Sequence, residues 1–307
     1  MKLSDDTNNK TLCVILHYGS EADTNGCIES LICENKIDIA VSDNDPRQSY
    51  LPPVDLRARV KLFRTGGSAR FSEGNNIAAR AFLSSHHDSV FILNNDTIVT
   101  PGAIDLLRST LFLDGVGAVG PCMPYASDQE KVWACGGYID KLRLNIGGMQ
   151  PKSKLPYEVD YLPAAAILCR TEVWKTVGGL SESYFIAYEE AEFALDVRRY
   201  GYKVIADPRA VVLHKVGMSS EQKPEYYYNG LRNRLIFSKY LYGPHFGFLY
   251  GVLVTSGLAV STIWRQNFQD FYRNMRILVK AIIDEGTGAP LDRQHVLNSA
   301  IMKFSRP

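Results

Sequence analysis

The sequence carries almost no net charge. Its 307 residues include 34 Lys and Arg against 33 Asp and Glu, which gives a formal net charge of +1. The first two hundred residues also lack any run of Lys and Arg with aromatic residues between them. A protein that binds nucleic acid usually presents a basic patch to the phosphates. We therefore expect no nucleic-acid partner.

Paired cysteines and a secretory leader are missing too. None of the six cysteines belongs to a C-x-x-C pair, and several lie in apolar runs, which favours reduced and buried thiols. The first ten residues are polar and acidic, where a secretory signal would be basic and then apolar. We expect the protein to stay in the cytoplasm.

No long tract of biased composition interrupts the chain. Hydrophobic residues make up 46% and charged residues 22%, so the chain can bury a sizeable core and should fold throughout except at its two ends. A chain of this length suits one elaborated α/β domain with an appendage, and two full domains are the alternative.

Apolar runs alternate with segments of helical spacing. Strands are expected at 11–19, 38–46, 60–64, 89–96, 115–124 and 159–170, with a strand pair at 203–215. Helices are expected at 27–36, 74–85, 101–112, 171–180 and 189–201, with a hairpin or loop region at 125–160. Because strands that alternate with helices form mainly parallel sheets, the expected class is α/β, a Rossmann-like mixed sheet flanked by helices.

Polar side chains follow two of the expected strands. Asp43 and Asn44 end one strand, and Asn94, Asn95 and Asp96 end another. Ligands of parallel sheets bind beyond the carboxyl ends of the strands. Oxygen-bearing side chains there suit a divalent cation and a diphosphate. The structural alternative is that Asp96, or the threonine after it, caps the helix expected near residue 101.

Acidic residues crowd the start of the helix at 189–201. Glu189, Glu190 and Glu192 follow an aromatic run. The helix dipole favours acids at this end, so a structural role is one interpretation. Three neighbouring carboxylates also repel one another, and this repulsion can tune one of them toward base function. His214, directly after the last expected strand and on the side of Asp96, is a candidate ligand or a structural histidine.

The C-terminal part is aromatic and basic. Residues 214–280 contain nine Lys and Arg against three Asp and Glu. The charge-free run 246–264 approaches the length of a bilayer span, but it includes three Gly and four Ser or Thr, so we favour a membrane-surface or buried helix. An anionic lipid surface would suit this appendage, and a solvated helical cap or a subunit interface are the alternatives.

In this order, the segments resemble the family-2 glycosyltransferases of the GT-A fold, in particular the rhamnosyltransferase-like bacterial members. VILHYGSEADTNGCIESL is similar to their first strand and helix, and IAVSDNDP to the segment whose aspartate contacts the nucleotide base. The resemblance assigns that role to Asp43, with Asn44 beside it. SEGNNIAARA is similar to the family's GNNxG segment, which implies that Gly74, Asn75 and Asn76 lie against the nucleotide sugar.

The later segments complete the resemblance. NNDT is similar to the family's DXD motif, with Asn at its first acidic place, and implies Asp96 as a metal ligand and Asn94 and Asn95 near the ribose and diphosphate. His214 matches a histidine that often completes the metal or diphosphate site. YFIAYEEAEFALDVRRYGY resembles the acceptor segment, with Glu190 at the place of the family's aspartate base and Glu189 at that of the preceding acid.

A further segment, YYYNGLRNRLIF, is similar to a YY-RN stretch and implies that Arg232 and Asn233 lie near the donor diphosphate or the acceptor. The resemblance thus implies a GT-A catalytic domain over residues 1–220, with nucleotide-sugar and acceptor halves, and a helical extension over 221–307.

The activity implied is that of an inverting hexosyltransferase that depends on Mg²⁺ or Mn²⁺. Its expected donor is dTDP-rhamnose, or otherwise a UDP-hexose. Its expected acceptor is a glycan or lipid-linked glycan of cell-surface polysaccharide synthesis, such as O-antigen, with peripheral contact at the cytoplasmic face of the inner membrane.

Two other classes remain open. A sugar-phosphate nucleotidyltransferase would carry Lys or Arg in the loop after its first strand, and HYGSEADTNG has neither. A non-catalytic nucleotide-sugar-binding protein would keep the fold without the chemistry.

Overall fold

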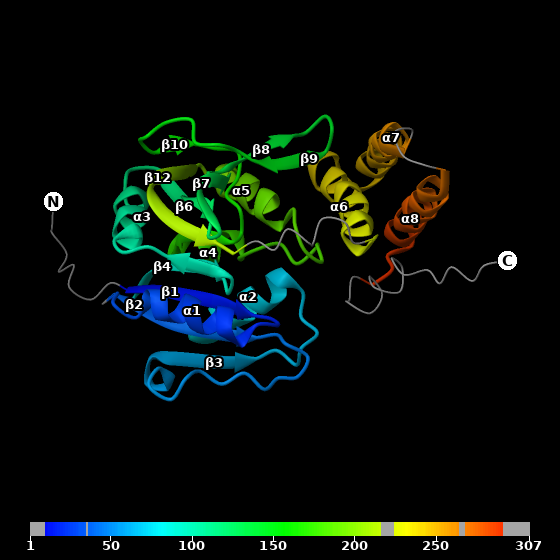
Figure 1. Cartoon of the computed structure of the whole chain (residues 1–307). Helices are drawn as coiled ribbons and strands as arrows, with labels where there is room; N and C mark the ends of the chain where they lie inside the picture. Colours follow the sequence, from blue (N-terminus) through cyan, green and yellow to red (C-terminus); the bar gives the residue numbers. More distant parts are fainter. Residues whose placement is uncertain (1–9, 35, 216–223, 264–267, 291–307) are drawn as a thin grey trace.

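The computed structural model describes residues 10–34, 36–215, 224–263 and 268–290. The domain boundary expected after residue 220 lies outside these ranges. Strands and helices alternate as the sequence predicts (Figure 1). The strands are β1 (Lys10–His17), β2 (Ile37–Asp43), β3 (Val60–Arg64), β4 (His87–Asn94), β5 (Thr97–Val99), β6 (Val116–Tyr125), β7 (Asp128–Ala134), β8 (Gly137–Asp140), β9 (Asn145–Gly148), β10 (Tyr157–Glu158), β11 (Ala166–Arg170) and β12 (Lys203–His214). The helices of this part are α1 (Glu21–Leu31), α2 (Phe71–Phe82), α3 (Ala103–Leu111), α4 (Thr171–Val177) and α5 (Glu189–Arg199).

Most of the strands form one mixed sheet. Its main path runs β10, β12, β6, β11, β4, β1, β2, β3. The pairs β1–β2, β1–β4, β2–β3 and β6–β12 are parallel, whereas β11 is antiparallel to β4 and β6. The strands β1 to β4, β6 and β12 therefore share one direction, and their carboxyl ends meet at one edge. The expected α/β class with a mainly parallel central sheet is confirmed.

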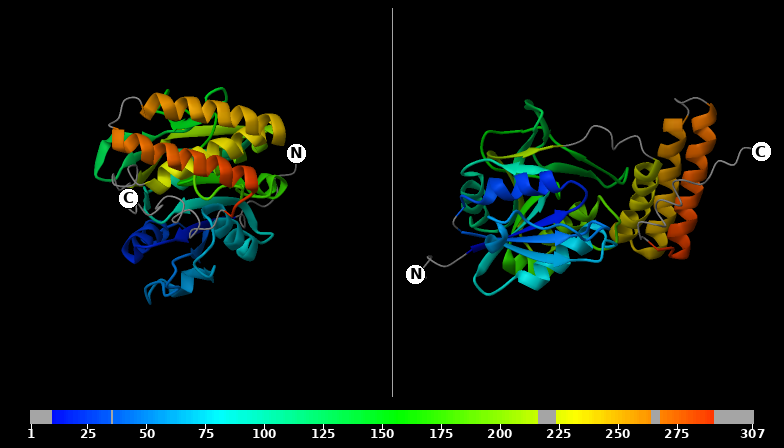
Figure 2. Two further views of the ribbon diagram at one scale, coloured as in Figure 1. Left: turned by 90° about the vertical axis from the view of Figure 1, so that its right-hand side faces the viewer. Right: turned by 60° about the horizontal axis from the view of Figure 1, so that its bottom comes forward.

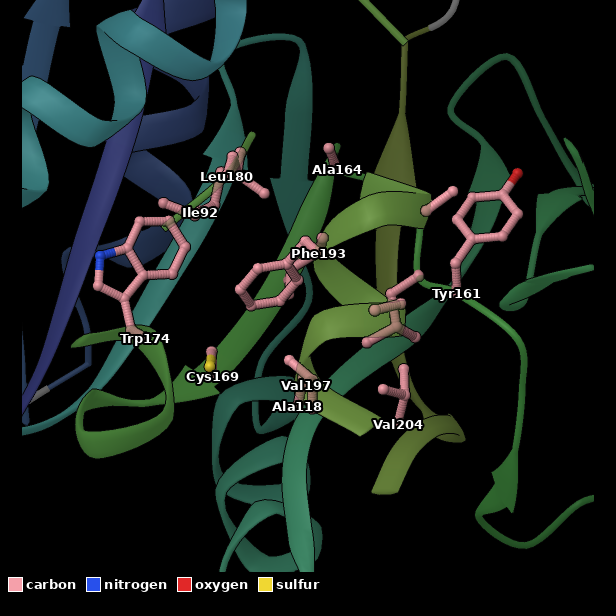
Figure 3. Close-up of a cluster of buried hydrophobic side chains, with 14 of the residues drawn as sticks. Ile92, Ala118, Tyr161, Ala164, Cys169, Trp174, Leu180, Phe193, Val197 and Val204 are labelled. Carbon is pink, nitrogen blue, oxygen red and sulfur yellow. The ribbon is translucent and has the colours of Figure 1, made fainter. Parts of the chain in front are cut away.

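Helices cover both faces of the sheet. On one face α2, α4 and α5 bury side chains against the strands, and Figure 3 shows Trp174 of α4 and Phe193 and Val197 of α5 in this core. On the other face α1 and α3 do the same through apolar residues such as Ile28 and Leu107. These residues are at most 4% exposed, so each contributes close to its full transfer free energy, about 1.5–3 kcal/mol.

Two local expectations are wrong. The region 203–215 is one bent strand, β12, and no strand pair. A bulge between Asp207 and Val211 bends it, because Asp207 Oδ1 accepts the backbone N–H of Arg209 in a local turn at 3.1 Å. The capping alternative for Asp96 and Thr97 is also excluded, because Thr97 begins β5 and the next helix begins at Ala103.

Three further helices, α6 (Pro224–Tyr242), α7 (Pro244–Ile263) and α8 (Phe268–Thr287), stand together at one side of the sheet domain, with α6 innermost (Figures 1 and 2). The hydroxyl of Tyr240 on α6 donates to Asp196 of α5 at 2.6 Å, and Phe237 joins the core beneath. No helix in the described ranges is both long and apolar enough to cross a bilayer.

Candidate active site

The carboxyl ends of the parallel strands place the expected polar residues side by side. His17, the last residue of β1, is in register with Asp43 at the end of β2, and Leu16 is in register with Asn94 at the end of β4. Helix α5 begins at this same edge, since the chain that leaves its C-terminus enters β12 at the opposite edge. The arrowheads of β3 and β12 point to the side where α6 stands (Figure 1).

Asp43 is completely buried and has one unused oxygen. Its Oδ1 accepts the backbone N–H of Asp45 at 3.2 Å, whereas Oδ2 has no hydrogen bond and lies 3.8 Å from Arg64 Nε. A buried carboxylate oxygen without a donor is costly to folding, by about 1–3 kcal/mol or more for a charged group. Asp43 thus offers an acceptor for a ligand N–H at the strand ends.

His17 is a site residue that the sequence interpretation missed. Its Nδ1 lies 2.6 Å from the hydroxyl of Thr24, and Thr24 also accepts from Asn95 Nδ2 at 3.0 Å. The ring stacks on Tyr50 with centroids 4.3 Å apart. Burial lowers the pKa of His17, although the nearby Asp43 opposes the shift, so the ring is neutral at pH 7. Its place at the end of the run VILH is the feature that would have identified it.

Asp96 and His214 come together from different strands. Because β12 pairs with β5, His214 lies opposite Thr97 and next to Asp96. Its Nε2 is 3.2 Å from Asp96 Oδ1, without the alignment of a hydrogen bond. Asp96 Oδ1 and His214 Nδ1 are both buried and make no hydrogen bond. The rings of Trp133 and His214 pack in a T-shaped arrangement with their centroids 4.4 Å apart.

This pair fits a divalent cation. Two ligands at adjacent corners of an octahedron with bonds of about 2.1 Å lie about 3 Å apart, which is close to the distance found between Asp96 and His214. A carboxylate and an imidazole are also a donor set that Mn²⁺ or Mg²⁺ accepts, with water and substrate oxygens filling the remaining places. The residues that could hold a metal at the strand ends are therefore Asp96 and His214.

A second cluster, Asp38, His86 and His87, brings three ligand atoms within 4.8 Å at the opposite edge of the sheet. Against the effect of burial, hydrogen bonds from Lys10 and His86 lower the pKa of Asp38 to about 2. His87 Nδ1 accepts the backbone N–H of Ser84 at 3.0 Å, so the proton of the neutral ring sits on Nε2, which faces Asp38 at 3.2 Å. A protonated nitrogen cannot bind a metal, so His87 acts in this cluster as a hydrogen-bond donor to Asp38.

Three of the residues expected to contact the nucleotide sugar also have a structural role. Asn44 accepts the backbone N–H of Ala69 and donates to its carbonyl, which holds the loop before α2. A β-carbon at Gly74 would lie 2.6 Å from Leu16 Cδ1, so the glycine lets α2 approach β1. Asn76 exchanges hydrogen bonds with the backbone of Leu180, at 2.8 and 3.0 Å.

The neighbouring asparagines have fewer hydrogen-bond partners within the protein. Asn75 Oδ1 is buried and has no hydrogen-bond partner, and its amide donates to the carbonyl of Phe71 at 3.0 Å. Asn95 bridges the Tyr18 carbonyl and Thr24, while Asn94 follows the last core residue of β4. Asn75 therefore has an unused amide oxygen, and Asn94 and Asn95 lie at the carboxyl end of β4.

Glu189 and Glu190 follow a turn of unusual backbone geometry. Ala187 and Tyr188 have φ angles of 68° and 77°, in the left-handed region that costs a non-glycine residue about 1–3 kcal/mol. The Tyr188 hydroxyl donates to the Leu144 carbonyl at 2.8 Å and so ties this turn to β9. Glu189 and Glu190 follow directly and form the start of α5.

The two carboxyl groups have different environments. Burial raises the pKa of Glu190 to about 7, and the backbone N–H groups of Glu190 and Tyr188 limit the shift. Glu190 is half-buried, and its Oε2 has no hydrogen-bond partner. Glu189 is only 2% exposed, and burial together with the charge of Glu190 raises its pKa well above the usual range. At neutral pH, Glu190 can therefore accept a proton, whereas Glu189 is neutral.

Arg232 is bound within the C-terminal part of the chain. It is 2% exposed, and its guanidinium donates within the C-terminal helices to Glu285 at 3.2 Å, to the Tyr228 hydroxyl at 3.2 Å, and to the carbonyls of Pro290 and Ala289. The guanidinium is thus held by groups of the C-terminal part, and its place near the donor diphosphate or the acceptor stays a prediction.

Asn233 has a different place from its neighbour. Its amide donates to the carbonyls of Ile186 and Ala187 at 2.8 and 3.0 Å, directly before the glutamate pair. It therefore holds the strained turn before the glutamate pair, and its place near the donor diphosphate or the acceptor stays a prediction.

The chain has distant sequence relatives, and no model of a protein family matches it. The uncharacterized protein y4gI of Sinorhizobium fredii is 26% identical over 179 residues, 54% of this chain and 19% of that protein. The dTDP-rhamnosyl transferase RfbF of Shigella flexneri is 20% identical over 218 residues, 69% of this chain and 71% of RfbF. The uncharacterized protein Rv1525 of Mycobacterium tuberculosis is 24% identical over 156 residues, 48% of this chain and 55% of that protein. The chain spans less than two thirds of y4gI and Rv1525.

Solved structures resemble the whole sheet domain. GalNAc-T7 with UDP, GalNAc and Mn²⁺ has a TM-score of 0.57 at 14% identity, over 73% of this chain and 48% of GalNAc-T7. The mannosyltransferase PcManGT from Pyrobaculum calidifontis with GDP-Man and Mn²⁺ has a TM-score of 0.54 at 12% identity, over 97% and 88% of the two chains. Residues 1–349 of S. aureus TarS have a TM-score of 0.55 at 13% identity, over 90% and 80%. The chain has the GT-A fold of these glycosyltransferases.

Proposed function

We propose that the protein is an inverting glycosyltransferase that moves a sugar from a nucleotide-diphosphate donor to a hydroxyl of a glycan or lipid-linked glycan. The observation that carries this proposal is the presence, at one edge of the sheet, of two groups: the unpartnered Asp96 Oδ1, which lies 3.2 Å from His214 Nε2, and the Glu190 carboxyl, whose pKa lies near 7. A leaving diphosphate and an attacking hydroxyl need these two kinds of group.

The donor would lie along the strand ends. Asp43 would accept an N–H of the base, and Asn75, Asn94 and Asn95 would contact the ribose, sugar and diphosphate. Asp96 and His214 would hold Mg²⁺ or Mn²⁺, whose chemistry is to neutralise charge on the leaving diphosphate. We favour dTDP-rhamnose as donor and cell-surface polysaccharide as product, because the relative RfbF is a dTDP-rhamnosyl transferase. A UDP-hexose is the second choice.

The reaction is a single displacement. Glu190 takes the proton of the acceptor hydroxyl as its oxygen forms a bond to the anomeric carbon. The bond between that carbon and the diphosphate oxygen breaks on the opposite face, and the nucleoside diphosphate leaves with the bonding electrons. Glu189 is buried and neutral, so it adds no second negative charge beside Glu190. One displacement inverts the anomeric centre, and no covalent enzyme intermediate forms.

Release of nucleoside diphosphate from a panel of dTDP- and UDP-sugars, with Mn²⁺ or Mg²⁺ and a mixed glycan acceptor, tests this function. We expect one donor to be turned over much faster than the others. Donor binding without release from any member of the panel would favour the non-catalytic alternative. Release of pyrophosphate from a nucleoside triphosphate and a sugar phosphate would identify a nucleotidyltransferase.

The pH dependence should report Glu190. Because this carboxyl must be ionised to accept a proton, kcat/KM should be low in acid and rise with pH through about 7. A profile from about pH 5 to about pH 9 measures it. A rate that stays constant down to about pH 5 would show that the base is an ordinary exposed carboxylate, since such a group is ionised throughout this range.

We also propose peripheral contact with an anionic membrane. Phe246, Leu249 and Leu253 form a stripe on α7 and are 63%, 68% and 71% exposed. The tip of the β8–β9 hairpin joins this stripe, because Tyr250, whose ring stacks on Phe246, donates to the carbonyl of Leu142, which is itself 74% exposed. The exposed cations Lys141 and Arg143 flank Leu142, which suits anionic headgroups.

Co-sedimentation with phosphatidylglycerol vesicles tests the membrane proposal. The double variant Leu249→Asp/Leu253→Asp should bind at least about tenfold more weakly, because each buried leucine contributes about 1.5–3 kcal/mol. The exposed Leu113→Asp, at the other end of the molecule beyond α3, should bind as wild type does. Equal sedimentation of all three proteins would contradict membrane contact through α7.

A further inference from the structure

The guanidinium of Arg234 on α6 has no acidic partner in the part of the chain that the structure describes. Its neighbours on α6, Arg232 and Lys239, both pair with Glu285, at 3.2 and 2.6 Å. Arg234 instead makes two long hydrogen bonds, from Nη2 to Asn145 Oδ1 at 3.3 Å and from Nη1 to a backbone carbonyl of its own helix at 3.4 Å. Its Nε is buried and makes no hydrogen bond. A half-buried charge in this state is costly to folding unless a ligand completes it.

A second unused donor lies on the same face of α6. Tyr227 precedes Arg234 by seven residues, which is two helical turns, and its hydroxyl is buried without a hydrogen-bond partner. Burial raises the pKa of Tyr227 and the Arg234 charge opposes this shift, so the two groups are within electrostatic reach.

Between them is Gly230. A β-carbon at Gly230 would meet only Arg234 Nη1, at 3.9 Å, so close packing does not require a glycine here. A glycine inside a helix is otherwise unfavourable relative to alanine. The surface between Tyr227 and Arg234 is thus kept free of a side chain.

This surface adjoins the proposed acceptor side. Tyr188 precedes the glutamate pair and donates to the carbonyl of Leu144, the residue before Asn145. Burial raises the pKa of Tyr188 to about 12, with the Arg234 charge opposing the shift and the Glu190 carboxylate adding to it. Arg234 and Glu190 are therefore both within electrostatic reach of the Tyr188 hydroxyl. A molecule whose sugar reaches Glu190 can thus place a neighbouring group at Arg234.

We infer that Arg234 and Tyr227, with Asn145 orienting the guanidinium, form a subsite for an anionic group of the acceptor. The planar guanidinium presents two N–H groups to two oxygens of a phosphate or a carboxylate, and the tyrosine adds a third donor. The anion is either the phosphate that links a glycan to its lipid or the carboxylate of an acidic sugar. This inference rests on the proposed function in assigning the acceptor, while the anion site itself does not require turnover.

Equilibrium binding of three probes to the full chain tests the subsite: decyl diphosphate, decyl glucuronide and the neutral decyl glucoside. We expect one of the two anions to bind more tightly than the glucoside. Arg234→Gln should weaken that anion roughly ten- to hundredfold, Arg234→Lys should weaken it less, and Tyr227→Phe about two- to tenfold. Arg57→Gln removes an equal charge from the exposed segment before β3 and should change nothing.

The probe that responds identifies the source of the anion. Loss confined to decyl diphosphate assigns a lipid-linked phosphate, and loss confined to decyl glucuronide assigns an acidic sugar. If neither anion binds more tightly than the glucoside, or if Arg234→Gln and Arg57→Gln weaken all probes equally, the subsite is overturned. Donor hydrolysis without acceptor is measured on the wild type and the same variants. If the proposed function is wrong, no hydrolysis is seen, whereas the binding of the probes is as expected.

Discussion

Replacing Glu190 with glutamine should lower kcat by about 10²- to 10⁴-fold, the range that a general base contributes. The amide keeps the size of the side chain and removes the proton-accepting oxygen, so the loss should fall on kcat and leave the KM for the donor close to that of the wild type. Steady-state rates of nucleoside diphosphate release, at saturating donor and acceptor, measure it.

Glu189→Gln is the matched control for this variant. Glu189 is buried and neutral at pH 7, so glutamine replaces one uncharged group with another and should keep most of the activity. An equal loss in both variants, or a larger loss in Glu189→Gln, would assign the base to Glu189 or show that the pair acts as one unit.

Stability separates a catalytic role of Glu190 from a structural one. The folded-state pKa of this group is raised above that of an unfolded glutamate, so its contribution to stability falls as the pH rises from the ordinary glutamate range to about 7 and stays unfavourable at higher pH. Glu190→Gln should therefore unfold at the same or a higher temperature than wild type at about pH 8. A strongly lowered unfolding temperature would mean that the variant loses activity through its fold.

Replacing Asp96 with alanine should lower kcat/KM by about 10²- to 10³-fold and abolish its dependence on Mn²⁺ or Mg²⁺. The loss follows because Asp96 supplies the only carboxylate of the proposed metal pair, and His214 alone binds a hard cation weakly. Activity measured against the concentration of Mn²⁺ checks both parts of this expectation.

Asp38→Asn is the control for Asp96→Ala. It changes the carboxylate of the cluster of Asp38, His86 and His87 at the opposite edge of the sheet. Lys10 and the two histidines surround this carboxylate. We expect this variant to be less stable and to keep the metal dependence of the wild type. If Asp38→Asn loses the response to Mn²⁺ and Asp96→Ala keeps it, the metal assignment is reversed.

Much of the site follows from local sequence. The run VFIL is apolar and is followed by Asn-Asn-Asp, so a buried strand with polar residues at its carboxyl end is the natural prediction, and β4 has this form. The cluster of glutamates after an aromatic run likewise marks the start of α5. In both cases the predicted element and its end depend on neighbours within a few residues.

The remaining residues depend on distant partners. Asn76 binds the backbone of Leu180, 104 residues later, and Arg232 is neutralised by Glu285 from a helix without a readable motif. A motif places such residues near a ligand, whereas their hydrogen bonds are fixed by a segment that the motif does not include. His17 combines both kinds of dependence: its place at the end of the run VILH is local, whereas the stacking of its ring on Tyr50 depends on a distant segment.

The most direct test of the central claim is a crystal structure of the protein with Mn²⁺ and either UDP or dTDP, in which anomalous scattering locates the metal. The account predicts a manganese peak between Asp96 and His214, with the diphosphate beside it at the carboxyl ends of β2 and β4. A manganese peak at Asp38, His86 and His87, or a nucleotide bound away from the strand ends, would contradict it.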